Sequence, residues 1–208
     1  MQRSGRVYEQ AFEGWLIERR VPYVPMDQAR RRLFARSRIK TFDFLLYPRG
    51  GGILLAELKG RRFKGTTLAG LRGLECWVTR EDLRGLYQWR RIFGVGGEEV
   101  RAAVVFAYRL EHVDVESDGH EVYDFGAARY TFFMVDVDDY GRFMKPRSGR
   151  WQTVTLAAAV FRRVAVEAGR YLLGPGAPAD RASGRVLSDY ADGSGKPDSP
   201  RDAGGGPR

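Results

Sequence analysis

Apolar residues recur at helical spacing in two segments of the chain. In the first, from about residue 6 to residue 19, apolar side chains return every three or four positions until Pro22. The second runs from about residue 80 to residue 93. It opens with Thr79 and Asp82, which are spaced as in a capping box, and Gly94 follows it. Both segments are predicted to be helices.

Shorter runs of apolar and aromatic residues predict strands. Residues 40–47 and 52–59 flank a turn-forming Pro-Arg-Gly-Gly segment and predict a hairpin. The order of all the elements predicts an α/β fold in which helices flank a mixed β-sheet. The remaining predicted elements are a short helix or ordered loop over residues 27–36, a buried strand over 101–109, a second hairpin over 120–125 and 129–136, and a short helix near 138–144.

Length and glycine content divide the chain in two. A chain of 208 residues fits one domain, and a hydrophobic share of 43% is enough to fill its core. From residue 174 onward, 13 of the last 35 residues are Gly or Pro, and few are large and apolar. The predicted organisation is one folded domain over residues 1–173 and a disordered tail over residues 174–208.

Net charge suggests a partner. The chain carries +9 at pH 7, and its last 35 residues hold five Asp against five Arg or Lys, so the excess lies on residues 1–173. A basic body favours a polyanion such as nucleic acid, although ordinary soluble proteins carry such a charge too.

Cysteine content and hydropathy bear on the compartment. Cys76 is the single cysteine, predicted to be a small core residue, and this excludes an internal disulfide and a multi-cysteine zinc site. No apolar run is long enough for a signal peptide or a membrane span. The prediction is a cytoplasmic protein with no membrane partner.

Three charged residues stand inside the first predicted hairpin. Side chains alternate between the faces of a strand, so Glu57 and Lys59 share a face about 6.6 Å apart. Pairing across the turn would bring Asp43 close to Glu57. Two such carboxylates can hold a hard divalent cation such as Mg²⁺ or Mn²⁺, and a neighbouring lysine can orient water or offset charge at phosphorus.

A structural alternative is a charged strand end, where Glu57 and Lys59 pair with each other or with solvent. Asp43 favours the chemical interpretation, because it lies between Phe42 and Phe44 in an apolar strand. A carboxylate buried there is costly unless a cation or a metal compensates it.

An acidic helix followed by FDF and a hairpin into ELK resembles the PD-(D/E)xK nuclease superfamily. This resemblance implies a restriction-endonuclease-like fold and a metal-dependent nuclease site. The opening GRVYE, residues 5–9, is similar to that of archaeal Holliday-junction resolvases, one branch of the superfamily. In those enzymes the helix glutamate adds to the metal site, which implies that role for Glu9. Resolvases also act as dimers, which makes a homodimer possible here.

Most of residues 7–151 resembles more closely an uncharacterised bacterial family known by the opening HYExAFE. The name of that family describes a sequence pattern and not a reaction. Val7 replaces the opening histidine of the family, and Phe42 stands where the superfamily often has proline before Asp43. The segments that carry the likeness are VYEQAFE, PYVPMDQARRRL, KTFDF, ELKGRRF, CWVTREDLRGLYQW and DDYGRFMKPRSGRW.

Two further residues are secondary candidates for the site. Glu13 lies one helical turn after Glu9 and could reach the metal in its place, although helix surfaces commonly carry glutamate. Gln88 could face the substrate, as glutamines do in some superfamily branches, but Ile92 replaces the tyrosine usual four residues later.

Basic clusters lie on both sides of the candidate site and could line a phosphate channel or form a solvated face. A second basic patch, at Lys145, Arg147 and Arg150, has no position that the sequence defines. The alternating His and acidic residues from His112 to His120 are predicted to form a polar loop or hairpin edge, because a straight strand cannot converge them on one ion. The candidate nucleic-acid-binding residues are Arg31, Arg32, Arg38, Lys40, Arg61, Arg62 and Lys64.

The leading hypothesis is hydrolysis of phosphodiester bonds by a PD-(D/E)xK-type site, with DNA favoured over RNA as the substrate. Asp43 and Glu57 are the predicted magnesium ligands, Glu9 is an outer ligand, and Lys59 acts on the water or the developing charge. The alternative is a non-catalytic nucleic-acid-binding module on the same fold. A third possibility is a protein-interaction fold with structural charges.

Overall fold

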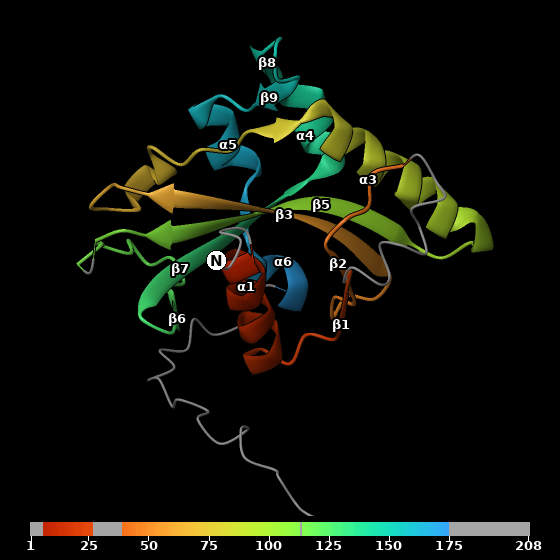
Figure 1. Cartoon of the computed structure of the whole chain (residues 1–208). Helices are drawn as coiled ribbons and strands as arrows, with labels where there is room; N and C mark the ends of the chain where they lie inside the picture. The colour runs from red at the N-terminus through yellow and green to blue at the C-terminus, as the bar shows by residue number, and fades with distance from the viewer. Residues whose placement is uncertain (1–5, 27–38, 113, 175–208) are drawn as a thin grey trace, which may run out of the picture.

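A curled, seven-stranded mixed β-sheet runs through the centre of the molecule (Figure 1). The structure is a computed structural model that describes residues 6–26, 39–112 and 114–174. The strand order is β1-β2-β3-β5-β7-β10, with β6 paired to β7. The strands are β1 (Tyr23–Pro25), β2 (Phe44–Leu46), β3 (Ile53–Phe63), β5 (Val100–Leu110), β6 (Tyr123–Phe125), β7 (Ala128–Asp136) and β10 (Val166–Glu167).

The parallel pair β3 and β5 forms the centre of this sheet. Their register pairs each residue of β3 with one of β5, from Ile53 opposite Val100 to Phe63 opposite Leu110. Parallel strands are covered on both faces, and both strands are accordingly rich in apolar residues that are buried in unbroken runs. The other described pairings in the main sheet are antiparallel.

Helices cover the two faces of the sheet. On one face, α1 (Arg6–Glu18) packs on Leu54, Ala56 and Leu58 of β3, and α6 (Ala168–Leu173) packs against β7 and β10. On the other face lie α3 (Arg80–Phe93), α4 (Val137–Phe143) and α5 (Ala158–Val164), over a core that includes Leu55 and Phe106. Figure 1 shows the first pair below the sheet and the other three helices above it.

A second, three-stranded sheet lies on the α3 side, in the order β4-β9-β8. Short 3-10 turns follow β3 and α3. The bounds of these elements are β4 (Val78–Thr79), β8 (Lys145–Ser148), β9 (Thr153–Thr155), η1 (Ala69–Leu71) and η2 (Gly94–Gly96).

The principal predicted elements are confirmed. The helix over residues 80–93 has the predicted bounds, and its capping box between Thr79 and Asp82 is present. Both predicted hairpins form antiparallel pairs, β2 with β3 and β6 with β7. Cys76 is buried in the core. The α/β class with helices on both faces of a mixed sheet is therefore established.

Some boundaries differ from the predictions. β2 begins only at Phe44, whereas β3 continues to Phe63, because β5 supports β3 beyond the point where β2 has left it. β6 begins at Tyr123 instead of residue 120. The predictions for residues 27–36 and for the tail after Gly174 lie outside the described residues. No helix in the described ranges has the length and apolar character needed to cross a bilayer.

Candidate functional site

The candidate site lies on β3, where β2 no longer accompanies it. Because the two strands are antiparallel and Phe44 pairs with Ala56, residues of β3 after Ala56 have no partner on β2. Asp43 takes over this edge. Its backbone N–H donates to the Ala56 carbonyl at 2.9 Å, and its carboxylate Oδ2 accepts from the Leu58 N–H at 2.8 Å.

This contact places the Asp43 carboxylate beside the backbone that joins Glu57 to Lys59. The Met26 N–H also donates to the Asp43 carbonyl at 2.8 Å, so backbone hydrogen bonds hold the residue on both sides. Asp43 is half-buried, and the hydrogen bond from the Leu58 N–H offsets part of the free-energy cost of burying its carboxylate. The structural and the chemical interpretations of Asp43 are compatible, because a carboxylate has further acceptor sites.

Glu57 and Lys59 lie on the same face of β3, as strand alternation predicts, and they contact each other. The Lys59 Nζ donates to Glu57 Oε1 at 2.7 Å. It also lies 2.9 Å from Oδ2 of Asp82, which is 2% exposed at the start of α3. Lys40 pairs with the other oxygen of Asp82, and its Nζ is 4.0 Å from Glu57 Oε1. We call Lys40, Asp43, Glu57, Lys59 and Asp82 the charged cluster.

Asp82 is the residue of this cluster that the sequence interpretation missed. The predicted capping box is present, and Asp82 accepts from the Thr79 N–H at 2.8 Å. That bond turns the carboxylate toward the helix start, where it meets Lys59. The ammonium group of Lys40, a predicted nucleic-acid contact, faces Asp82. One sequence feature could have identified Asp82 as part of the site: it is an acidic residue at the start of the helix that follows the ExK strand.

Helix α3 also fixes the segment that carries Lys40. The Trp89 Nε1–H donates to the Lys40 carbonyl at 3.0 Å. Gly85 faces the same carbonyl so closely that a Cβ atom there would lie 2.6 Å from it. A glycine at this position therefore lets α3 approach the chain just before β2, which brings Asp82 to the cluster.

The pKa values in the cluster are shifted in opposite directions. Burial, and next the nearby Asp43 carboxylate, raise the pKa of Glu57 to about 8, although Lys59 acts against them. For Asp82, burial also favours the neutral form, but Lys59 and Lys40 outweigh it and hold the pKa below its usual range. For Lys59, burial opposes the charge, but Glu57 and Asp82 raise the pKa above its ordinary value.

These shifts follow from the arrangement of the charges. Lys59 and Lys40 both pair with Asp82, and Lys59 also donates to Glu57. Glu57 is 5% exposed and lies near the Asp43 carboxylate, so burial and this like charge disfavour its charged form. A proton on Glu57 or a bound cation would relieve this cost.

The helix glutamates lie on α1, which covers the opposite face of the sheet from α3, and Glu9 is half-buried there. Glu13 accepts a hydrogen bond from the Tyr23 hydroxyl at 2.8 Å. Within the described ranges, no three His, Cys, Asp or Glu side chains are grouped so that they could hold a metal ion. Gln88 is exposed on α3.

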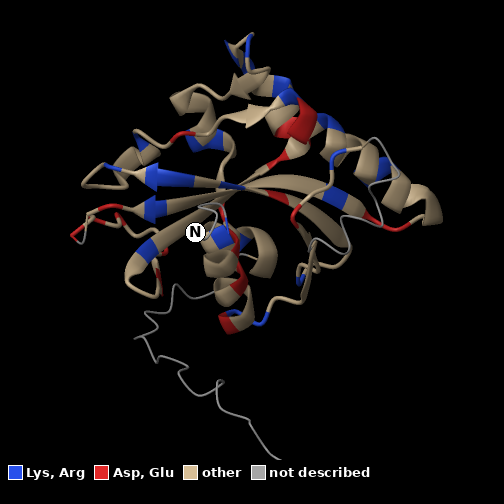
Figure 2. Cartoon of the chain, viewed as in Figure 1, with Lys and Arg blue, Asp and Glu red and all other residues tan. Residues whose placement is uncertain are grey.

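The predicted basic channel is divided among different surroundings. Arg61 lies on the α3 face against Trp77, whereas Arg62 lies on the other face and bonds to Glu111 through two nitrogens. Figure 2 shows basic residues at the ends of β3 and β5, and acidic residues at the start of α3. The predictions for Arg31, Arg32 and Arg38 lie outside the described residues.

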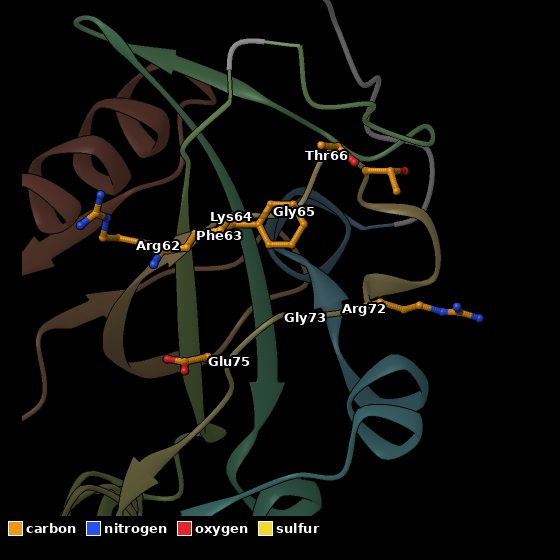
Figure 3. A pocket seen from close by; sticks show the side chains of 9 residues that line it. Arg62, Phe63, Lys64, Gly65, Thr66, Arg72, Gly73 and Glu75 are labelled. Carbon is orange, nitrogen blue, oxygen red and sulfur yellow. The ribbon is translucent and has the colours of Figure 1, made fainter.

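A surface hollow of about 750 Å³ opens beyond the end of β3 (Figure 3). Arg62, Lys64 and Arg72 line it, but no residue of the charged cluster does. Figure 3 shows the Arg62 and Arg72 side chains pointing to opposite sides, so they do not converge on one ligand.

The histidines do not form a metal site with their acidic neighbours. His120 Nδ1 lies 2.5 Å from Glu167 Oε1, and His112 Nε2 lies 3.1 Å from the Lys64 carbonyl. In the described part of residues 111–122 the chain forms turns and one isolated bridge, at Glu116, as expected for a polar loop.

Fold and site together define an α/β domain with a buried, mixed-charge cluster at the open edge of its central parallel pair. Comparisons of the chain with family models, with curated proteins and with solved structures gave no match. The interpretation of the site therefore depends on its chemistry.

Proposed function

We propose that the protein hydrolyses phosphodiester bonds in nucleic acid at a PD-(D/E)xK-type site formed by Asp43, Glu57 and Lys59. DNA is the favoured substrate over RNA. The observation that carries the proposal is the arrangement of Glu57, a buried carboxylate that lies near the Asp43 carboxylate and accepts a hydrogen bond from Lys59 at 2.7 Å. The mixed sheet and its β2–β3 hairpin support the restriction-endonuclease-like fold and the HYExAFE likeness that belong to the same proposal.

The donor set fits a hard divalent cation at one point of this cluster. Asp43 and Glu57 offer carboxylate oxygens from adjacent chain segments, and burial beside Asp43 disfavours the charged form of Glu57 unless a cation is bound. These two residues would hold Mg²⁺ or Mn²⁺, which when bound supplies activation of water and charge neutralisation at phosphorus. Glu9 as an outer ligand stays a prediction.

The residues of the chain have distinct roles in the proposed reaction. Lys59, charged and held between Glu57 and Asp82, can hydrogen-bond the attacking water or an oxygen on phosphorus. Asp82 is a positioning residue, because it acts on substrate only through the ammonium groups it holds. Asp43 keeps its carboxylate at the strand edge through the Leu58 N–H.

One feature favours the second candidate, a nucleic-acid-binding module without turnover. Lys59 already bridges Glu57 and Asp82, and no group of three metal-binding side chains occurs among the residues that the structure describes. A cluster in which ion pairs only stabilise the fold would have these properties.

Nucleic-acid cleavage with and without metal separates the two candidates. Supercoiled, single-stranded and four-way-junction DNA are incubated with the protein and Mg²⁺ or Mn²⁺, or with a chelator. Wild type is expected to cleave only with metal, and Asp43→Asn and Lys59→Met to lose at least about a hundredfold in rate. Asp138→Asn, which removes an exposed carboxylate paired with Arg90, is the matched control and keeps activity. Equal cleavage by all four proteins, or metal-independent binding without cleavage, would overturn the proposal.

A further inference from the structure

Arg61 is a largely buried cation without an acidic partner. It lies on β3 two residues after Lys59, on the same face, and its Nη1 donates to the Gly60 carbonyl at 2.8 Å. Its guanidinium lies 3.9 Å from the centre of the Trp77 ring. No carboxylate among the described residues forms an ion pair with it. Arg62, the next residue, has Glu111 as such a partner.

Trp77 joins Arg61 to the small sheet. The guanidinium of Arg147, on β8, lies 4.9 Å from the same indole. This contact locates the second basic patch of the sequence, Lys145, Arg147 and Arg150, next to the end of β3. All three side chains are exposed, and none forms an ion pair with a described carboxylate. Glu75, which accepts from the Trp77 indole N–H at 3.3 Å, is the acidic group in direct contact with this region.

The turn between β8 and β9 presents a second indole to solvent. Trp151 is 67% exposed, with the guanidinium of Arg150 at 5.2 Å from its ring. Gln152 has a φ of 48°, in the left-handed region, and its carbonyl accepts from the Arg80 N–H at 2.9 Å. Since Arg80 is the first residue of α3, the turn is attached beside the helix start that carries Asp82.

These residues come from the end of β3, from the chain just before β4 and from the β8–β9 hairpin, and all of them are basic or aromatic. We call this set the Trp151 wing. Figure 1 shows the β8–β9 hairpin rising above the main sheet, and Figure 2 shows its basic residues. The wing consists of Arg61, Trp77, Lys145, Arg147, Arg150 and Trp151.

We propose that the Trp151 wing binds an unpaired segment of nucleic acid, with its guanidinium groups on the phosphates and the Trp151 indole stacked on a base. Lys145, Arg147 and Arg150 are exposed and pair with no carboxylate of the described residues, so they complement a chain of phosphates. An exposed indole on an attached turn offers a flat surface at little entropic cost, and aromatic side chains stack on bases of any sequence. Bases within a duplex already stack on one another, so a protruding indole reaches an unpaired base.

This inference rests on the proposed function in one respect. It predicts that the nucleic acid that reaches Lys59 contains an unpaired segment. Arg61 and Lys59 project from the same face of β3, so a strand held by the wing continues toward the charged cluster. The binding itself requires no cleavage.

The test is fluorescence anisotropy of a labelled thymidine 20-mer, and of a duplex of equal length, in a buffer with a chelator. Trp151→Ala is expected to lower the affinity for the single strand about tenfold. The loss of affinity for the duplex should be less than about fivefold. Trp151→Phe should recover most of the loss. Arg147→Gln should weaken both and lower the salt dependence by about one counterion. Arg90→Gln, whose guanidinium is paired with Asp138, is the control and binds as wild type.

The proposal for the Trp151 wing is overturned if Trp151→Ala binds the single strand as tightly as wild type does. It is also overturned if the variant loses equal affinity for the single strand and the duplex. The cleavage assay with Mg²⁺ or Mn²⁺ separates this inference from the nuclease proposal. If Trp151→Ala loses single-strand binding but wild type does not cleave with metal, the wing stands and the nuclease fails. If wild type cleaves and Trp151→Ala binds and cleaves normally, the nuclease stands and the wing fails.

Discussion

The two faces of β3, a strand of 11 residues, carry side chains of different kinds. On the α1 face, Leu54, Ala56 and Leu58 lie in an apolar cluster with the helix, and Gly60 admits the Tyr8 ring. On the α3 face, the apolar Leu55 is followed by Glu57, Lys59 and Arg61. The change occurs at the residues where β2 no longer accompanies the strand.

This difference shows how a fold can support an unfavourable charge. Hydrophobic burial on the α1 face stabilises the strand in a fixed position, so the α3 face can hold the charged cluster. Arg61 and Arg62 show the contrast within two adjacent residues, because among the described residues only Arg62 forms an ion pair with a carboxylate.

The strongest way to disturb the α3 face is Asp82→Ala. This change removes the capping acceptor of α3 and leaves two lysines without their shared carboxylate, in a position that is 2% exposed. The free energy of unfolding is expected to fall by about 3 kcal/mol or more. Urea denaturation measures it. Asp138→Ala, at a 62% exposed ion pair, should cost no more than about 1 kcal/mol. Equal costs would mean that the cluster contributes no special stability.

Gly60→Ala perturbs the α1 face instead. A Cβ atom at this position would lie 2.4 Å from the Tyr8 ring, so the ring or the helix must move. We expect a loss of roughly 1–3 kcal/mol in the free energy of unfolding, measured by the same denaturation. Gly50→Ala is the matched control, since a Cβ atom there has nothing within 4 Å. A loss as small as that of the control would show that α1 packs loosely on β3.

A smaller effect distinguishes the faces by pH. Folding raises the pKa of Glu57 to about 8, so the folded state holds a proton that the unfolded carboxyl releases near pH 4.3. Its stabilising contribution is therefore full below that pH and is lost as pH rises through about 8. The slope from this group is about 1 kcal/mol per pH unit. Denaturation midpoints from pH 5 to 9 should fall in wild type and fall less in Glu57→Gln.

Asp82 contributes with the opposite sign. Its pKa is lowered by Lys59 and Lys40 against the effect of burial, so its contribution is present above the unfolded pKa and is lost in strong acid. Parallel pH curves for wild type and Glu57→Gln above pH 5 would contradict the raised pKa of Glu57.

The sequence was informative where local rules decide the structure. The capping box at Thr79 defined α3, and strand alternation correctly placed Glu57 and Lys59 on one face. The elements after residue 144 were not predicted, because β8, β9 and β10 are short and depend on contacts with distant strands.

The composition of the site was less predictable than its position. Asp82 reaches the charged cluster only because Gly85 and Trp89 hold α3 against the Lys40 carbonyl, a contact across 42 residues or more that no local pattern contains. For the same reason the sequence could not locate the Arg147 patch. Its position depends on a tertiary contact with Trp77.

Glu57→Gln in the cleavage assay tests the central claim most directly. Glutamine keeps the shape of a protonated Glu57 and an oxygen that can accept from Lys59, so the protein should fold at least as stably as wild type. It cannot supply the carboxylate that the proposed cation requires. We predict a folded Glu57→Gln protein that binds DNA with wild-type affinity and cleaves it at least about a hundredfold more slowly with Mg²⁺ or Mn²⁺. Cleavage at the wild-type rate would contradict a nuclease site at Glu57.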